Sequence, residues 1–203
     1  MIDRNAYLEK LISSKNNGFP KVITGVRRCG KSYLLKEIYR GYLKSIGIKE
    51  ESILVIELDD DINALYRNPL KLGQHVREFC KDKKDCYVFI DEVQLIATIA
   101  NPAFTNGDIR LAKDTDKEVI SFVDVVLGLS REPNIDLYVT GSNSKMLSSD
   151  IVTEFRDKAI NIHMSPISFS EFFSYKGTGK YEALHEYMQF GGMPLAVLAS
   201  IEK

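Results

Sequence analysis

Several features that would place a protein in a broad class are missing from this sequence. No apolar run approaches the ~18 residues that a membrane-spanning helix needs, and charged side chains such as Asp3 and Arg4 interrupt the first residues, so we expect no signal peptide. The cysteines (Cys29, Cys80 and Cys86) are odd in number, at spacings that fit neither a zinc site nor a disulfide framework. These absences favour a cytoplasmic protein with reduced thiols.

A net charge is also nearly absent. The 27 lysine and arginine residues oppose 28 aspartate and glutamate residues, which leaves a formal charge of −1. The chain therefore lacks the basic excess typical of nucleic-acid-binding proteins, and only short clusters (residues 27–28 and 81–84) keep nucleic acid open as a partner. With 203 residues, 44% of them hydrophobic, the chain is large enough for one substantial core with a small appendage.

The most informative stretch is GVRRCGKS at residues 25–32, which matches the phosphate-binding pattern Gly-x-x-x-x-Gly-Lys-Ser at every position. Gly25 and Gly30 let the backbone turn and approach a ligand without a Cβ in the way. Successive backbone N–H groups then bind phosphate oxygens. Lys31 supplies a charge for the β- and γ-phosphates, and Ser32 offers a hydroxyl to Mg²⁺. The predicted phosphate-binding residues are Gly25, Val26, Arg27, Arg28, Cys29, Gly30, Lys31 and Ser32.

The flanking residues test this prediction, because the motif should follow a buried strand and open a helix. Residues 21–24 (KVIT) form a short β-branched run after a Gly-Phe-Pro breaker. Apolar residues recur at helical spacing from Leu34 to Tyr42. The strand and the helix expected on either side of the motif are both present, so a chance match is disfavoured. The sequence therefore predicts binding of a nucleoside triphosphate.

A second site signal is the apolar strand 86–92, which ends in Asp91 and Glu92. Carboxyl ends of buried parallel strands are where ligands bind in α/β sheets. Asp91 is expected to hold Mg²⁺ in partnership with Ser32, and Glu92 to act as general base toward an attacking water. Two acids that merely end a strand would be the favoured interpretation if this motif stood alone, but the upstream loop makes the functional one stronger.

Two weaker candidates follow a predicted strand at residues 135–140. Asn143 is a candidate sensor of the γ-phosphate or the attacking water, although ordinary turn and helix-cap chemistry explains it equally well. Arg156, near the end of a predicted helix at 145–157, is a candidate for stabilising transition-state charge in cis or from a neighbouring subunit. A cation at a helix C-terminus also has a simple electrostatic explanation, which is the simpler one for Arg156 taken alone.

The remaining pattern predicts an α/β protein with a central parallel sheet. Apolar runs at 52–58 and 159–164 complete five strands, and helices are expected over 1–14, 68–80, 119–127, 168–177 and 181–189. Residues 96–117 have no clear period and are expected to be a lid, a partner-binding insertion or disordered.

Motifs throughout the chain resemble those of the AAA-type ATPase domain of an uncharacterised prokaryotic family of P-loop NTPases. They lie at residues 24–32 (TGVRRCGKS), 90–94 (IDEVQ), 139–147 (VTGSNSKML), 165–172 (SPISFSEF) and 191–194 (GGMP). The resemblance implies a five-stranded sheet of the additional-strand type, with strand four between strands one and three. It also implies ATP and Mg²⁺ as ligands, and a core of residues 1–166 followed by a helical extension at 167–203 that begins a further C-terminal region. Relatives carry Gly-Arg where this chain has Asp157-Lys158, which leaves Arg156 rather than Lys158 as the arginine candidate.

Three functions are compatible with these residues. The first is an ATPase that drives a conformational change in an attached module or an unidentified protein partner, and Glu92 favours it because attacking water needs a base. The second is a nucleotide-gated switch with little hydrolysis, which would use the same site. A kinase comes third, since no acceptor pocket with its own charges is evident. Oligomerisation stays open, and adenine is implied by the resemblance rather than by a base-reading motif.

Overall fold

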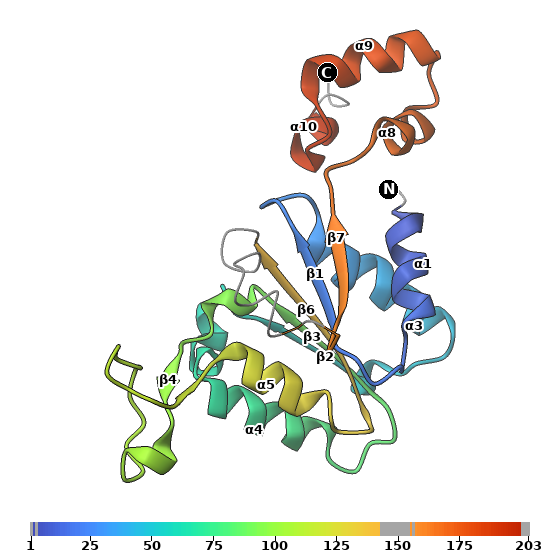
Figure 1. The fold of residues 1–203 in the computed structure, drawn as a ribbon. Helices are drawn as coiled ribbons and strands as arrows, with labels where there is room; N and C mark the ends of the chain where they lie inside the picture. Colours follow the sequence, from blue (N-terminus) through green and yellow to red (C-terminus); the bar gives the residue numbers. More distant parts are fainter. Residues whose placement is uncertain (1, 3, 143–154, 156, 200–203) are drawn as a thin grey trace.

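The computed structural model describes residues 2, 4–142, 155 and 157–199, and its centre is a five-stranded parallel sheet. The strands are β1 (Lys21–Gly25), β2 (Ile53–Glu57), β3 (Cys86–Asp91), β6 (Ile135–Ser142) and β7 (Ile160–Met164), in the order β2-β3-β6-β1-β7 (Figure 1). All four pairings are parallel. The fourth strand of this sheet lies between the first and the third, so the expected additional-strand type of fold is confirmed.

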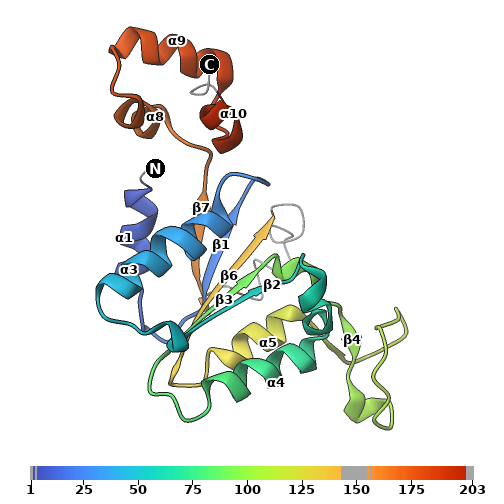
Figure 2. The same cartoon turned by 180° about the vertical axis from the view of Figure 1, so that it is seen from behind.

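Helices cover both faces of the sheet, which explains why the central strands are apolar almost throughout. On one face, α4 (Pro69–Cys80) and α5 (Phe122–Leu129) pack against side chains such as Val88 and Val139. On the other lie α1 (Asn5–Ser13) and the helix that follows the glycine loop (Figures 1 and 2). That helix runs through α2 (Lys31–Tyr33), a π-helical stretch (Leu34–Tyr39) and α3 (Arg40–Ser45).

A buried polar network lies at the amino edge of the sheet, opposite the glycine loop. Lys21 and Asp136 form an ion pair there, with side chains 0% and 5% exposed. The Tyr138 hydroxyl donates to Asp136 at 2.6 Å and lies 2.5 Å from the Tyr39 hydroxyl. Burial lowers the pKa of Lys21 against the opposing pull of Asp136, and it raises the pKa of both tyrosines. The network therefore fixes the start of β1 and β6 with charges that water does not reach.

Residues 96–120 project from the sheet as an arm (Figure 1). The arm is built on two short antiparallel strands, β4 (Ile99–Ala100) and β5 (Val119–Ile120). The predicted helix at 119–127 was therefore wrong at its start: Val119 and Ile120 are in a strand, and α5 begins after Ser121, whose capping box with Asp124 sets the first turn. A bidentate contact from Arg110 to Asp116 stabilises the arm.

The helical extension packs beyond the carboxyl edge of the sheet (Figure 1). It consists of α8 (Phe169–Lys176), α9 (Lys180–Phe190) and α10 (Pro194–Ala199). The predicted capping box of Ser168 and Glu171 opens α8, and Gly177 ends it in the left-handed conformation. Ile167 donates to the Gly192 carbonyl at 2.7 Å, which ties the segment after β7 to the turn before α10. No helix in the described part of the chain is long and apolar enough to cross a membrane.

Candidate nucleotide-binding site

The glycine loop joins the carboxyl end of β1 to the helix that starts at Lys31. Gly25 has φ 156°, and a Cβ at this position would lie 2.2 Å from the Met164 carbonyl oxygen of β7. Gly30 has φ 102°, in the left-handed region that favours glycine. Close contact with β7 and this positive φ therefore account for both glycines of the motif.

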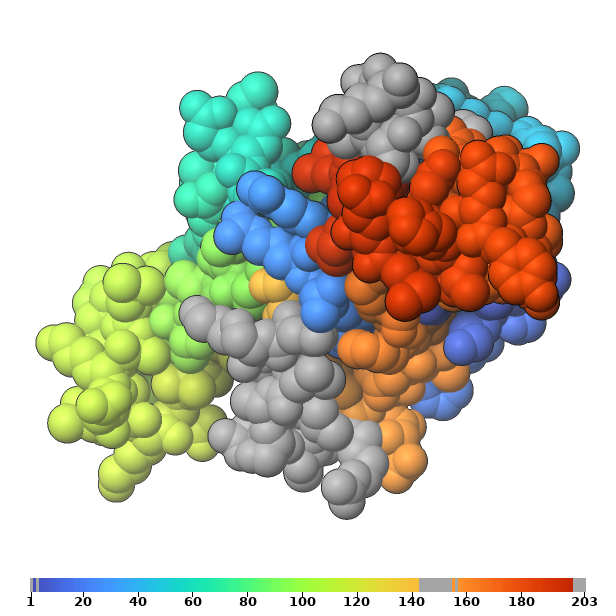
Figure 3. Space-filling view, turned by 90° about the horizontal axis from the view of Figure 1, so that it is seen from above, coloured from blue at the N-terminus to red at the C-terminus, as the bar shows by residue number. Residues whose placement is uncertain are grey.

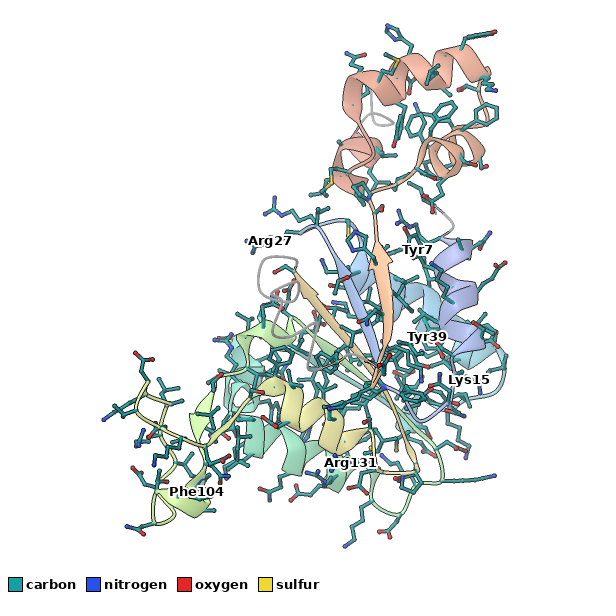
Figure 4. All side chains as sticks on the ribbon, viewed as in Figure 1. Tyr7, Lys15, Arg27, Tyr39, Phe104 and Arg131 are labelled. Atoms are coloured by element: carbon teal, nitrogen blue, oxygen red, sulfur yellow. The ribbon has the colours of Figure 1, made fainter. Side chains whose placement is uncertain are left out.

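The side chains of the loop differ in their surroundings. The Lys31 ammonium is buried and donates to the carbonyls of Gly25 at 3.1 Å and Val26 at 3.0 Å. Arg27 is exposed at the tip of the loop and extends away from the sheet (Figure 4). Cys29 is fully buried beside the Met164 carbonyl. The lysine is thus held inside the loop, where phosphate oxygens would compete with two carbonyls for its protons.

Asp91 and Glu92 stand at the carboxyl end of β3, two strands away from the loop. Asp91 is 7% exposed, and its Oδ1 accepts a hydrogen bond from the hydroxyl of Thr140 on β6. The same hydroxyl accepts from the backbone N–H of Glu92 at 3.2 Å. Thr140 is itself fully buried. One side chain on the intervening strand therefore contacts both of the predicted acidic site residues.

Glu92 is held in a restricted conformation. Its backbone is left-handed, with φ 58° and ψ 48°, which is uncommon for a residue other than glycine. Its carboxylate accepts a hydrogen bond from the Gln94 amide, which also donates to Ser142 Oγ at 3.1 Å. Local strain of this kind persists only where neighbouring groups impose it. Thr140, Gln94 and Ser142 are those groups.

The sheet order brings the predicted residues to one edge. The loop follows β1 and the acids end β3, and only β6 separates the two strands. At the usual strand spacing of about 4.8 Å, β1 and β3 are about 10 Å apart. Ser32 is partly buried in the first turn after the loop, at the end of β1. Asn143 and Arg156 lie outside the described residues, so both remain predictions.

A cavity of about 240 Å³ lies on the other side of the loop, toward β7. Most of its lining is apolar and comes from the N-terminal segment, the loop, β7 and the helical extension. The lining residues are Ile2, Arg4, Cys29, Gly30, Tyr33, Met164, Ile167, Pro194 and Leu198. Figure 3, which looks down on the carboxyl edge, shows the loop (blue) directly beside the extension (orange to red). The cavity therefore adjoins the phosphate-binding loop and is closed in part by α10.

A family model described as an AAA domain matches residues 17–173, which include the loop and both acids. This chain belongs to that AAA domain family. An uncharacterised protein of Haemophilus influenzae is 32% identical to it over 205 residues, covering 98% of this chain and 45% of the relative. An uncharacterised protein of Methanocaldococcus jannaschii is 28% identical over 198 residues, covering 90% and 37%. This chain spans less than half the length of either relative.

Solved structures agree on the fold of the AAA domain. AMPPCP-bound DnaA from Aquifex aeolicus has a TM-score of 0.60 at 16% identity, over 99% of this chain and 60% of DnaA. A DNA replication initiation factor has a TM-score of 0.59 at 14% identity, over 97% and 58%. Identities this low show the fold alone. Family and fold together place the chain among ATP-binding domains of the ATPase type.

Three residues of the AAA domain site were not predicted from the sequence. Thr140 was assigned to a strand, although a polar side chain at the end of an apolar strand is a signal that points to it. Gln94 was assigned only to a motif, and it lies in the short helical turn after β3. Arg4 was noted only as a charge near the N-terminus. Its burial beside the loop depends on the packing of α8 and β7, which no local pattern records.

Proposed function

We propose that this AAA domain binds ATP and hydrolyses it with the help of Mg²⁺. The observation that supports this best is the common contact of Thr140 with Asp91 and Glu92. The Thr140 hydroxyl holds both acids at the carboxyl edge of the sheet, where the glycine loop follows β1. A phosphate-binding loop and a general base are useful together only if the nucleotide spans the interval between them.

The strand order supports one orientation of the bound nucleotide. The acids lie on the β6 and β3 side of the loop, and the cavity lies on the β7 side. A triphosphate with its γ-phosphate toward Glu92 therefore has its base directed toward the cavity. The backbone N–H groups of the loop and the Lys31 ammonium would bind the phosphates in between.

The oxygen ligands on the side of the loop that faces Asp91 and Glu92 suit Mg²⁺. This ion prefers hard oxygen ligands and is often bound by one or two protein groups together with substrate phosphates. The Ser32 hydroxyl and the Asp91 carboxylate are such groups. When bound, the ion would supply charge neutralisation at the β- and γ-phosphates.

Glu92 is the proposed general base. Its carboxylate would take a proton from the attacking water as the water oxygen bonds to the γ-phosphorus. The bond from the γ-phosphorus to the bridging oxygen would break, and ADP would leave with that oxygen. Gln94 and Thr140 would orient it. We further propose that Asn143 senses the γ-phosphate and that Arg156 stabilises the charge that develops on it.

The coupling of hydrolysis to motion would pass through the helical extension, because α10 forms one wall of the cavity beside the loop. We place the boundary between the ATPase core and the extension at residues 166 and 167, within the turn before α8. The extension exposes large apolar side chains, including Tyr181 (89% exposed) and Met188 (78% exposed). An attached module or a protein partner would receive the conformational change at this surface.

A nucleotide-gated switch is the second candidate, and one contact favours it. The Gln94 amide donates a hydrogen bond to the Glu92 carboxylate. In a switch, this bond would keep the carboxylate away from the attacking water. In this form the domain would bind ATP tightly and hydrolyse it slowly. Nucleotide retained by the purified protein would be the expected sign.

The test is to measure ATP binding and phosphate release for the wild type, Lys31→Ala and Glu92→Gln. We expect Lys31→Ala to lose binding and Glu92→Gln to bind ATP without releasing phosphate. Matched controls are Lys44→Ala, which removes an exposed lysine of α3, and Glu57→Gln, which changes an acid at the end of β2. Both controls should behave like the wild type.

Two results would change the proposal. ATP bound but not hydrolysed by the wild type, with Glu92→Gln indistinguishable from it, would favour the switch. Unchanged ATP binding in Lys31→Ala would refute the assignment of the loop.

A further inference from the structure

β7 is an edge strand of the sheet, and its two sides differ. β1 pairs with one side, and no described strand lies on the other (Figures 1 and 2). In a parallel pair, the backbone groups of every second residue point to the neighbouring strand, and those of the residues between point away from it. Ile160 donates to the Pro20 carbonyl at 2.9 Å, which sets this alternation. The N–H and C=O groups of Asn161, His163 and Ser165 therefore point outward.

The outer edge of β7 is closed at one end only. The Ser165 N–H donates to the Tyr7 hydroxyl at 3.1 Å, and the Ser165 carbonyl accepts from Arg4 Nη2 at 2.5 Å. The outward backbone groups of Asn161 and His163 have no hydrogen-bond partner among the described residues, and both residues are exposed. An exposed edge of this kind is a template for another strand.

β7 also lacks the features that usually protect an edge strand. Proteins block such edges with lysine, proline or inward-pointing charges, or with a bulge that bends the strand away. The sequence INIHM at residues 160–164 contains no proline, lysine, arginine or acid. Its pairing with β1 keeps one register from end to end, so it has no bulge. The edge is therefore open to β-strand addition.

A cavity of about 830 Å³ lies beside this edge, between α1 and α8. None of its lining residues belongs to the glycine loop, so it is separate from the candidate nucleotide site. α8 contributes the hydroxyls of Ser170 and Ser174, and α1 contributes Lys10, which is exposed and forms no ion pair among the described residues. The acid in the lining, Glu171, is paired with Arg4 at 3.3 Å. The unpaired charge at this surface is therefore positive.

We propose that the outer edge of β7 binds an extended acidic peptide of a partner protein. The peptide adds a strand to the sheet, and one of its carboxylates lies beside Lys10. An extended peptide has backbone donors and acceptors at the spacing that the edge requires. This surface is distinct from the exposed apolar side chains of the extension. Because β7 lies directly beside β1, a strand bound there joins the same sheet as the glycine loop.

The probe is a capped peptide of alternating threonine and glutamate, titrated into the isotope-labelled full chain and followed by NMR. The amide signals of Asn161 and His163 should shift. Each of these residues offers one N–H and one C=O, and hydrogen bonds of ordinary strength to these groups correspond to a dissociation constant of about 1 mM. The same peptide with N-methylated amides should not bind. A peptide of alternating threonine and lysine should bind about 10-fold more weakly, because Lys10 repels it.

Two variants test the backbone and the charge separately. Asn161→Pro removes an outward N–H and keeps the bonds to β1, since proline is tolerated on the open side of an edge strand. It should weaken binding of the acidic peptide about 10-fold. Lys10→Glu leaves the strand unchanged and should reverse the preference between the acidic and basic peptides. Lys117→Glu, which reverses an exposed charge on the arm, is the matched control and should change neither.

Several outcomes would overturn the inference. Unchanged affinity in Asn161→Pro, or binding of the N-methylated peptide, would show that the peptide does not pair with β7. Equal affinity for the acidic and basic peptides would refute the charge preference. The absence of any shift at about 10 times the expected dissociation constant would refute the site. If sedimentation then showed a dimer that Asn161→Pro abolishes, the edge would pair with a second copy of this chain instead.

Discussion

The Thr140→Val substitution tests the connection between the two acids. Valine has nearly the same shape as threonine, so the fully buried site on β6 stays filled and only the hydroxyl is lost. That hydroxyl donates to Asp91 and accepts from the Glu92 N–H at 3.2 Å. Losing a hydrogen bond to a carboxylate costs about 1.5–3 kcal/mol, and an unpaired buried N–H adds about 1 kcal/mol. We expect the free energy of unfolding to fall by about 2.5–4 kcal/mol.

The effect on activity should be specific. Glu92 would lose one of the contacts that impose its left-handed backbone, and small displacements of catalytic groups cost up to about 100-fold in rate. We expect kcat for ATP hydrolysis to fall about 10- to 100-fold, with the dissociation constant of ATP unchanged because the glycine loop is intact.

The assays are urea denaturation followed by circular dichroism, and phosphate release at saturating ATP. Thr24→Val is the matched control, since Thr24 is also buried but its hydroxyl makes one longer contact, 3.3 Å to His163 Nδ1. It should change the unfolding free energy by less than about 1 kcal/mol. If Thr140→Val left both unfolding and kcat unchanged, the acids would not depend on this hydroxyl and our account of the site would be refuted.

Two further predictions concern the ends of β1. Gly25→Ala would place a Cβ 2.2 Å from a carbonyl of β7. We therefore expect ATP affinity to drop at least 10-fold and the free energy of unfolding to fall by about 1–3 kcal/mol, measured by ligand titration and melting. Gly41→Ala, in an open helical position, is the control and should be neutral or slightly stabilising in the same experiments. Lys21→Met would leave Asp136 buried without its partner and should cost about 3–5 kcal/mol. The double variant Lys21→Met/Asp136→Asn should recover part of that loss, and equal stability of the single and double variants would contradict the ion-pair argument.

Local patterns predicted most of the fold. The apolar runs at 21–24, 52–58 and 86–92 are β1, β2 and β3 within two residues at either end, because strands buried on both faces have no polar interruptions. Capping boxes and glycines likewise predicted the start and end of α8. The strand order came from family resemblance, since spacing alone does not determine which strands pair.

The arm and the second contacts of the site were less predictable. Val119 and Ile120 continue the apolar spacing of α5, and only their pairing with Ile99 and Ala100 makes them a strand. The contact of Thr140 with Asp91 joins residues far apart in sequence through the register of β3 and β6. Tertiary packing decides such features, and a single sequence records them only as ordinary residues.

The central place of β1 has a consequence for biosynthesis. β1 begins at Lys21, but its two neighbours begin at Ile135 and Ile160, and Met164 and Pro194 complete the surroundings of Gly30. Pairings between such distant segments form late and slowly during folding. A ribosome-bound chain that has emerged only as far as β3 has the sequence of the glycine loop but not its two supporting strands. Nucleotide can therefore stabilise the domain only after almost all of it has been translated.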